Sequence, residues 1–122
     1  MLGPHLMLDF YGCEVNVDDE TLFKQILDEL PSLMGMKKLC EPVVLKYEGD
    51  EKTFDKGGIS GFVVIAESHI SFHTFRRRKF VAFDVFSCKD FDMEKVKQYL
   101  LEKLKPKRVE ENFVVRGRNF LK

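Results

Sequence analysis

The sequence has no tryptophan, only three cysteines and no excess of charge of either sign. The cysteines, Cys13, Cys40 and Cys88, are odd in number and widely spaced, which fits neither a disulfide framework nor a zinc site. Twenty basic residues balance twenty acidic ones, so no surface for nucleic acid or for a membrane is indicated. We therefore expect no bound metal and no nucleic-acid partner.

Long apolar runs are also missing, because none approaches the ~20 residues that a membrane-spanning helix needs. The N-terminal residues MLGPHLML lack the positive start and apolar stretch of a secretory signal, so a reducing cytoplasm is the expected location. A length of 122 residues with 44% hydrophobic residues is typical of one folded domain, and we take residues 1–122 as that domain.

Two segments show the apolar spacing of amphipathic helices. The first spans residues 18–30, with Asp18 as a plausible N-cap and Pro31 expected to stop or kink the helix. The second spans residues 93–105, with Asp92 as its cap and Pro106 closing it.

Six segments read as strands, joined by a polar glycine-rich loop at residues 49–58 and a basic turn at 76–79. The strands are residues 5–13, 41–48, 59–66, 69–75, 80–88 and 108–116. Short connections between successive strands favour antiparallel pairing. The expected fold is an α+β two-layer sandwich, a mainly antiparallel sheet with two helices on one face. Phenylalanine and valine on both sides of the strands predict that a second subunit covers the other face, giving a homodimer.

Ser68 stands between two predicted strands, flanked by Glu67 and His69. Alone, such a tripeptide is usually a polar turn, and no Gly-x-Ser-x-Gly elbow supports a serine hydrolase. His73 follows five residues later, and an odd separation in a strand puts two side chains on opposite faces. A catalytic pairing of His73 with Ser68 therefore requires a bend or a break near Ser68.

Cys88, at the end of a predicted strand, is by itself most simply an inert buried thiol. Asp84 shares its face by alternation, and an acid in an apolar strand should be paired or lie at a cleft. The basic run at 76–79 fits a solvated turn or a loop that contacts an anion.

Taken together, these residues resemble the small pyruvoyl-dependent S-adenosylmethionine decarboxylase proenzymes of bacteria and archaea. The match is close over residues 57–88, which include GGISGFVVIAESHISFHTF and FVAFDVFSC. The segments HLMLDFYGC and RVEENFVVRGR resemble the ends of the family more loosely.

The resemblance implies that the chain cuts itself between Glu67 and Ser68, giving pieces 1–67 and 68–122. Ser68 would attack the Glu67 carbonyl, pass through an ester and end as a pyruvoyl group, a covalent cofactor. His73 matches the proton-transfer residue of this processing, Ser60 the serine that assists it, and Cys88 the acid that returns a proton to the substrate. The implied product is the aminopropyl donor for spermidine synthesis.

The chemistry makes physical sense of such a group. Decarboxylation leaves negative charge on a carbon that no ordinary side chain can delocalise, so an electron sink is required. A pyruvoyl ketone forms a Schiff base with the substrate amine and supplies that sink, while a nearby thiol can protonate the carbanion. This mechanism uses a small-molecule substrate and needs neither a metal nor pyridoxal phosphate.

One position departs from the family pattern. After His73 the family usually has Thr-Trp-Pro-Glu, whose glutamate holds the ribose hydroxyls, whereas this chain has Arg77 at the glutamate position. A guanidinium has no acceptor for a hydroxyl and would repel a sulfonium cation. Phe54, Phe10 and Tyr11 match the region where the family stacks adenine. For this reason S-adenosylmethionine remains the first expected substrate, ahead of arginine or ornithine.

The alternatives are a pyruvoyl-dependent arginine or ornithine decarboxylase on the same scaffold, and a non-catalytic relative that regulates an active partner. A generic α+β binding module accounts for the strands and helices but not for the spacing of the candidate site residues.

Overall fold

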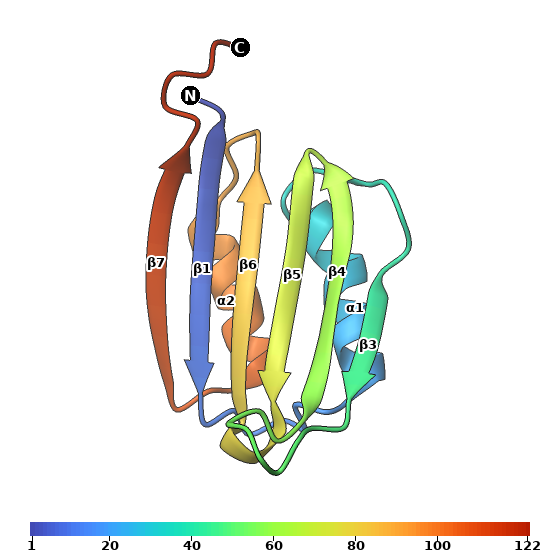
Figure 1. Ribbon diagram of the computed structural model, residues 1–122. Helices are drawn as coiled ribbons and strands as arrows, with labels where there is room; N and C mark the ends of the chain where they lie inside the picture. Colours follow the sequence, from blue (N-terminus) through green and yellow to red (C-terminus); the bar gives the residue numbers. More distant parts are fainter.

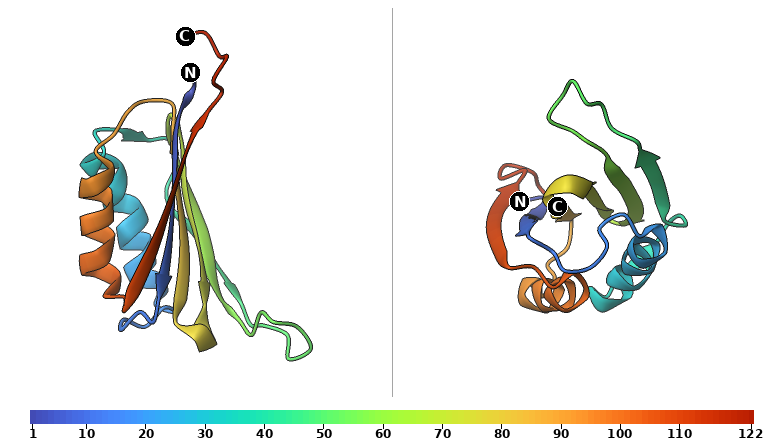
Figure 2. Two further views of the ribbon diagram at one scale, coloured as in Figure 1. Left: turned by 90° about the vertical axis from the view of Figure 1, so that its left-hand side faces the viewer. Right: turned by 90° about the horizontal axis from the view of Figure 1, so that it is seen from below.

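The computed structural model describes residues 1–122, which form one antiparallel sheet of seven strands with two helices packed on one face (Figures 1 and 2). The predicted α+β two-layer architecture is confirmed. The elements are β1 (Gly3–Tyr11), α1 (Glu20–Leu33), β2 (Lys37–Lys38), β3 (Val43–Tyr47), β4 (Gly58–Ala66), β5 (Ser68–Phe75), a 3₁₀ turn (Arg76–Arg78), β6 (Phe80–Ser87), α2 (Met93–Leu104) and β7 (Arg108–Arg116).

The strand order across the sheet is β2-β4-β5-β6-β1-β7, with β3 also paired to β4. Every pair is antiparallel. The hairpins β4–β5 and β5–β6 fill the middle of the sheet, and the first strand of the chain lies between β6 and β7 (Figure 1). The β4–β5 turn lies at the end of the sheet where both termini lie, and the 3₁₀ turn lies at the opposite end.

Helix α1 begins and ends later than its sequence pattern indicates. Its N-cap is Asp19, whose carboxylate accepts from the Leu22 N–H, while Asp18 forms an ion pair with Arg76 instead. Pro31 was expected to stop or kink the helix, and the stop is wrong, because Pro31 lies inside the helix, which continues to Leu33. Proline removes a single N–H donor, and only two helical residues follow it, so the cost of continuing is small.

Helix α2 follows its prediction closely. Asp92 caps it by accepting from the Lys95 N–H, and Lys105 ends it in the left-handed conformation just before Pro106. The buried stripe consists of Val96, Leu100 and Leu104.

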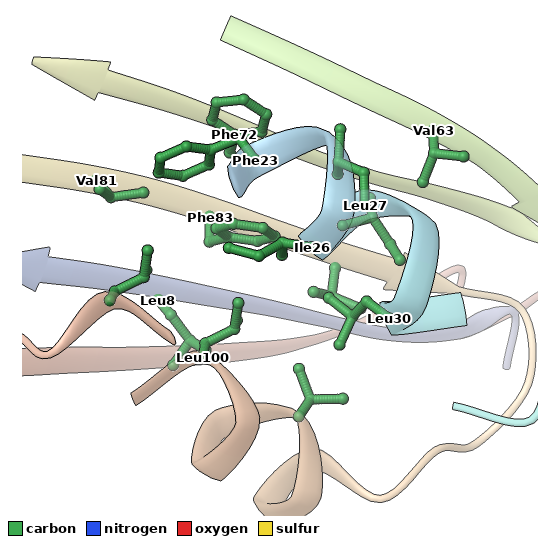
Figure 3. Close-up of a cluster of buried hydrophobic side chains, with 14 of the residues drawn as sticks. Leu8, Phe23, Ile26, Leu27, Leu30, Val63, Phe72, Val81, Phe83 and Leu100 are labelled. Atoms are coloured by element: carbon green, nitrogen blue, oxygen red, sulfur yellow. The ribbon is translucent and has the colours of Figure 1, made fainter. Parts of the chain in front are cut away.

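The hydrophobic core lies between the helices and the sheet (Figure 3). Alternate residues of the strands point into it, and Phe23 of α1 stacks on Phe72 of β5 with ring centroids 4.6 Å apart. Phe72 in turn stacks on Phe83 of β6. This packing sets the face on which every strand residue lies, and therefore which side chains can form a site.

The second face of the sheet, here called the open face, carries no helix (Figure 2). It nevertheless presents large apolar side chains to solvent, including Leu45, Tyr47, Phe62, Val64 and Val114, which are 38–64% exposed. Register places Leu45 beside Ser60 and Val64 beside His69 on this face. No helix is long and apolar enough to cross a membrane.

Candidate active site

The β4–β5 turn brings Ser68 next to Cys88. Ile65 pairs with Ser68 across the hairpin, so only Ala66 and Glu67 form the turn, and Ser68 opens β5. Because Ser68 also pairs with Ser87 at the end of β6, the next residue, Cys88, lies alongside it. The Ser68 Oγ and Cys88 Sγ atoms are 3.2 Å apart, and both residues are partly buried.

Cys88 also contacts the carbonyl group on the other side of the Glu67–Ser68 bond. Its backbone N–H donates to the Glu67 oxygen at 2.8 Å. A hydrogen bond of this kind polarises a carbonyl and stabilises the negative oxygen that forms when a nucleophile attacks it. Cys88 thus contacts both sides of the predicted cleavage bond: its N–H binds the Glu67 carbonyl, and its thiol contacts the Ser68 hydroxyl.

A hollow of about 390 Å³ adjoins this bond. Its walls are Leu2, Glu67, Cys88, Lys89, Phe120 and Lys122. The Lys122 ammonium donates to the Cys88 carbonyl at 2.7 Å, and the N-terminal amine donates to the Phe120 carbonyl at 3.0 Å. The two ends of the chain therefore form one wall of the hollow, a feature that strand and helix patterns did not indicate.

Ser60 and His73 form a second, separate pair. They face each other across β4 and β5, with the Ser60 Oγ 2.7 Å from the His73 Nδ1 atom on the open face. His73 is five residues from Ser68 along β5, a separation of about 17 Å in a strand. Ser68 alternates to the helix side of the sheet with Ile70 and Phe72. The structure therefore brings the four predicted residues together as two pairs, not as one cluster.

Near the β4–β5 turn, the open face carries a polar and aromatic cluster. The His5 Nε2 atom lies 3.0 Å from the Asp84 Oδ1 atom, so Asp84 is paired as its apolar setting predicts. The Phe86 ring is contacted by the rings of His5 and His69 and by the Arg116 guanidinium, 4.3 Å from its centroid. Burial, with the neighbouring His5 and Arg116, lowers the pKa of His69, while Asp84 opposes the shift.

An aromatic groove lies at the far end of the open face. The hollow, of about 400 Å³, is lined by Tyr11, Phe54, Phe75, Arg78 and Phe80. Phe54 stacks on Phe75 with centroids 6.1 Å apart, and Tyr11 meets Phe80 edge to face at 5.0 Å. A smaller hollow of about 210 Å³ continues it with Lys56, Gly57, Arg76 and Arg77. Phe75 and Phe80 face each other where β5 passes into β6, and this pairing places both rings in the groove.

Phe10 and Arg77 are the two residues of the expected substrate region whose surroundings differ most from those of a free ligand contact. Phe10 is fully buried in the core, because alternation along β1 turns it toward the helices while Tyr11 faces the groove. It is therefore not available to stack on a ligand. Arg77 lies at the groove but forms an ion pair with Glu51 of the β3–β4 loop at 2.5 Å. No cluster of three histidine, cysteine or acidic side chains suited to a metal ion occurs.

Comparisons with known proteins agree with this geometry. The family model described as S-adenosylmethionine decarboxylase matches residues 4–117. The S-adenosylmethionine decarboxylase proenzyme of Clostridium botulinum strain Langeland is 36% identical over 120 residues, covering 95% of each chain. That of Pyrobaculum neutrophilum is 34% identical over 117 residues, covering 93% of this chain and 87% of the relative. The crystal structure of the adenosylmethionine decarboxylase from Aquifex aeolicus superimposes with a TM-score of 0.77 at 25% identity, over 95% of this chain and 91% of that one.

The fold, shared over nearly its whole length with a solved decarboxylase, places the chain among the two-layer α+β enzymes. With a family model that spans almost the entire sequence and relatives above 30% identity, the particular group is also clear. The chain belongs to the S-adenosylmethionine decarboxylase family.

Proposed function

We propose that the protein is a self-processing decarboxylase of S-adenosylmethionine that carries a pyruvoyl group made from Ser68. One observation supports this most directly: Cys88 contacts both sides of the Glu67–Ser68 bond, by its N–H at 2.8 Å and its thiol at 3.2 Å. The names of the relatives, proenzymes of S-adenosylmethionine decarboxylase, agree with it.

In the processing reaction the Ser68 hydroxyl attacks the Glu67 carbonyl carbon, and the Cys88 N–H stabilises the developing negative oxygen. The peptide C–N bond breaks, the nitrogen takes up a proton and an ester joins Glu67 to the Ser68 side chain. Loss of the Ser68 α-proton then expels the Glu67 carboxylate and leaves a dehydroalanine at position 68. Water hydrolyses its imine form, which releases the amino nitrogen as ammonia and leaves a ketone. The products are residues 1–67 and a second piece, 68–122, that begins with the pyruvoyl group.

When it is in place, the pyruvoyl group acts as the electron sink for loss of carbon dioxide from the substrate. The surrounding residues suit its formation, since the Ser68 side chain already faces a thiol in a partly buried setting. In catalysis the Cys88 thiol holds a proton next to this position and delivers it to the substrate carbon after carbon dioxide has left. The product then serves as the aminopropyl donor for spermidine.

A homodimer completes the site. The Ser60–His73 pair lies about 17 Å along β5 from Ser68 in the same protomer, too far to move a proton there. Exposed apolar residues on the open face, such as Leu45 and Phe62, favour burial against a second copy. A two-fold axis perpendicular to the strands reverses their direction, and so carries the Ser60–His73 pair of one protomer toward the end of the sheet that holds Ser68 of the partner subunit.

This arrangement also gives the aromatic groove a role. Side chains alternate along β5, so Phe75 lies on the same face as His73, two residues or about 7 Å further along the strand. A substrate whose amine reaches Ser68 of the partner subunit can then place its adenine between the groove's rings. Phe54 and Tyr11 are the stacking residues, because both line the hollow.

The direct test is the mass of the purified protein under denaturing conditions. We expect two pieces that meet between Glu67 and Ser68, and the second should have no free amino terminus. Ser68→Ala should give one intact folded chain. Borohydride with S-adenosylmethionine should attach an adduct to the second piece. A panel of S-adenosylmethionine, arginine, ornithine and lysine then identifies the substrate by product mass. A chain that stays whole under every condition would rule out the pyruvoyl mechanism.

A further inference from the structure

The aromatic groove is surrounded by cations, and one exposed carboxylate lies among them. Lys56, Arg76, Arg77 and Arg78 contribute to the smaller hollow. Glu51, on the β3–β4 loop, reaches Arg77 with one oxygen at 2.5 Å and Lys56 with the other at 3.9 Å. Its side chain is 73% exposed, so it keeps lone pairs free for a further partner.

Other carboxylates near the groove are already engaged. The Asp18 Oδ2 atom is paired with Arg76 and Lys46, and its Oδ1 atom is buried, so with 16% of its side chain exposed Asp18 does not face a ligand in the groove. Asp55 accepts from the Gly57 N–H within the loop. Glu110, at the other end of the groove, accepts the Tyr11 hydroxyl. Glu51 differs from these acids because it contacts the cations of the smaller hollow while 73% of its side chain is exposed.

The loop that carries Glu51 is held in a defined shape. The Asp50 N–H donates to the Asp55 carbonyl at 3.0 Å, and the Lys56 ammonium donates to the Asp50 carbonyl at 3.2 Å. The Arg76 N–H ties the base of the loop to Gly57 at 2.8 Å. Figure 2 shows the loop projecting from the end of the sheet on the side away from the helices. It therefore presents Glu51 and Phe54 together, as one unit.

A nucleoside that stacks in the groove brings two neighbouring ribose hydroxyls with it. Each hydroxyl donates a hydrogen bond, and neither guanidinium nor ammonium groups can accept one. A carboxylate accepts two such bonds, which is how acidic residues recognise ribose in dinucleotide sites. A negative charge there also favours a substrate that carries a sulfonium cation.

We infer that Glu51 is the specificity residue that accepts the ribose hydroxyls of the substrate, while Arg77 and Lys56 hold its carboxylate in place. This inference rests on the proposed function, since it assigns a contact to the same nucleoside substrate. Arg77 is then a positioning residue. Arg77 does not itself accept a hydrogen bond from the ribose, but it holds in place the Glu51 carboxylate, which does.

The test compares Glu51→Gln with Glu48→Gln, a matched loss of charge at an exposed residue that begins the same connection and has no cation contact. Glu51→Gln should raise KM for S-adenosylmethionine about 10- to 100-fold, the range for hydrogen bonds to a charged acceptor, with kcat and self-cleavage nearly unchanged. Glu48→Gln should leave KM unchanged. Arg77→Ala should raise KM less, and Arg77→Lys should restore part of the loss.

A binding measurement separates this contact from catalysis. Calorimetry with the Ser68→Ala protein should show adenosine binding more tightly than 2′,3′-dideoxyadenosine, and Glu51→Gln in that background should abolish the difference. A preference for the hydroxyls that survives in Glu51→Gln, or its absence in the parent, would overturn the inference. If the wild-type protein fails to decarboxylate S-adenosylmethionine while the adenosine preference depends on Glu51, the proposed reaction fails and the contact stands.

Discussion

Mixing two inactive variants tests whether the processing site is built from two subunits. In the proposed mechanism Ser68→Ala removes the nucleophile and His73→Ala removes the proton-transfer group, so neither variant alone should cleave. In a dimer that contains one chain of each kind, the His73→Ala chain keeps its own Ser68 and meets the intact His73 of its partner. That chain should then be cut.

The expected yield follows from geometry and pairing. Proton transfer needs groups within about 3 Å, whereas Ser68 and His73 of one chain are about 17 Å apart along β5, so help within a chain is excluded. Random pairing of equal amounts gives about half mixed dimers, so about half of the His73→Ala chains should be cleaved. Loss of a general acid–base group slows a reaction roughly 10²- to 10⁴-fold, so the remaining chains should stay whole over the same period.

The assay uses chains with tags of different mass, expressed together and separated on a denaturing gel. Only the His73→Ala chain should be cut, and the Ser68→Ala chain serves as an internal control. Co-expression of His73→Ala with the double variant Ser68→Ala/His73→Ala should give no cleavage. If mixed dimers are isolated and the His73→Ala chain remains intact in them, the shared site is wrong.

The remaining predictions concern stability, thiol chemistry and assembly. Burial lowers the pKa of His69 below its usual 6.5, so near this pH the folded state binds fewer protons than the unfolded state. The free energy of unfolding should therefore fall as the pH drops below about 6.5. Denaturant titrations of His69→Gln should show a smaller decline. Burial raises the pKa of the Cys13 thiol to about 11, so iodoacetamide at pH 8 should modify Cys88 well before Cys13, as peptide mass analysis would show; equal labelling of the folded protein would contradict this. Phe62→Asp should yield monomers by light scattering and should also block self-cleavage, whereas a dimer that persists would mean that another surface is used. Phe72→Ala should cost about 3–5 kcal/mol of stability, measured by urea unfolding, because its ring is fully buried between Phe23 and Phe83.

Local patterns were sufficient wherever a short segment determines its own structure. The stripe and cap of α2 and the alternation of β5 and β6 were readable because each depends on neighbours in the chain. The cap of α1 was not, since Asp18 and Asp19 are equally good caps. The choice is made by Arg76, 58 residues away, which binds Asp18. Likewise β2, with two lysines and no strand pattern, exists only through its pairing with β4.

The site shows the same division. The proximity of Ser68 to Cys88 was implied by a family resemblance, and the structure supplies the reason, the register of a two-residue turn. The odd spacing of Ser68 and His73 indicated opposite faces, as observed. The resemblance places Phe10 in the substrate region, but alternation along β1 turns its side chain into the core. The Glu51–Arg77 pair joins a loop to a turn, a contact that periodicity cannot indicate.

The position of β1 determines what the proposed cut between Glu67 and Ser68 would do to the sheet. Residues 1–67 contribute β1 and β4, while residues 68–122 contribute β5, β6 and β7. Because β1 is hydrogen-bonded on one edge to β6 and on the other to β7, and β4 is bonded to β5, the two products are interleaved in a single sheet. If the proposed cleavage occurs, the two pieces should copurify as one particle and separate only when the sheet unfolds, so the cut would leave the fold intact.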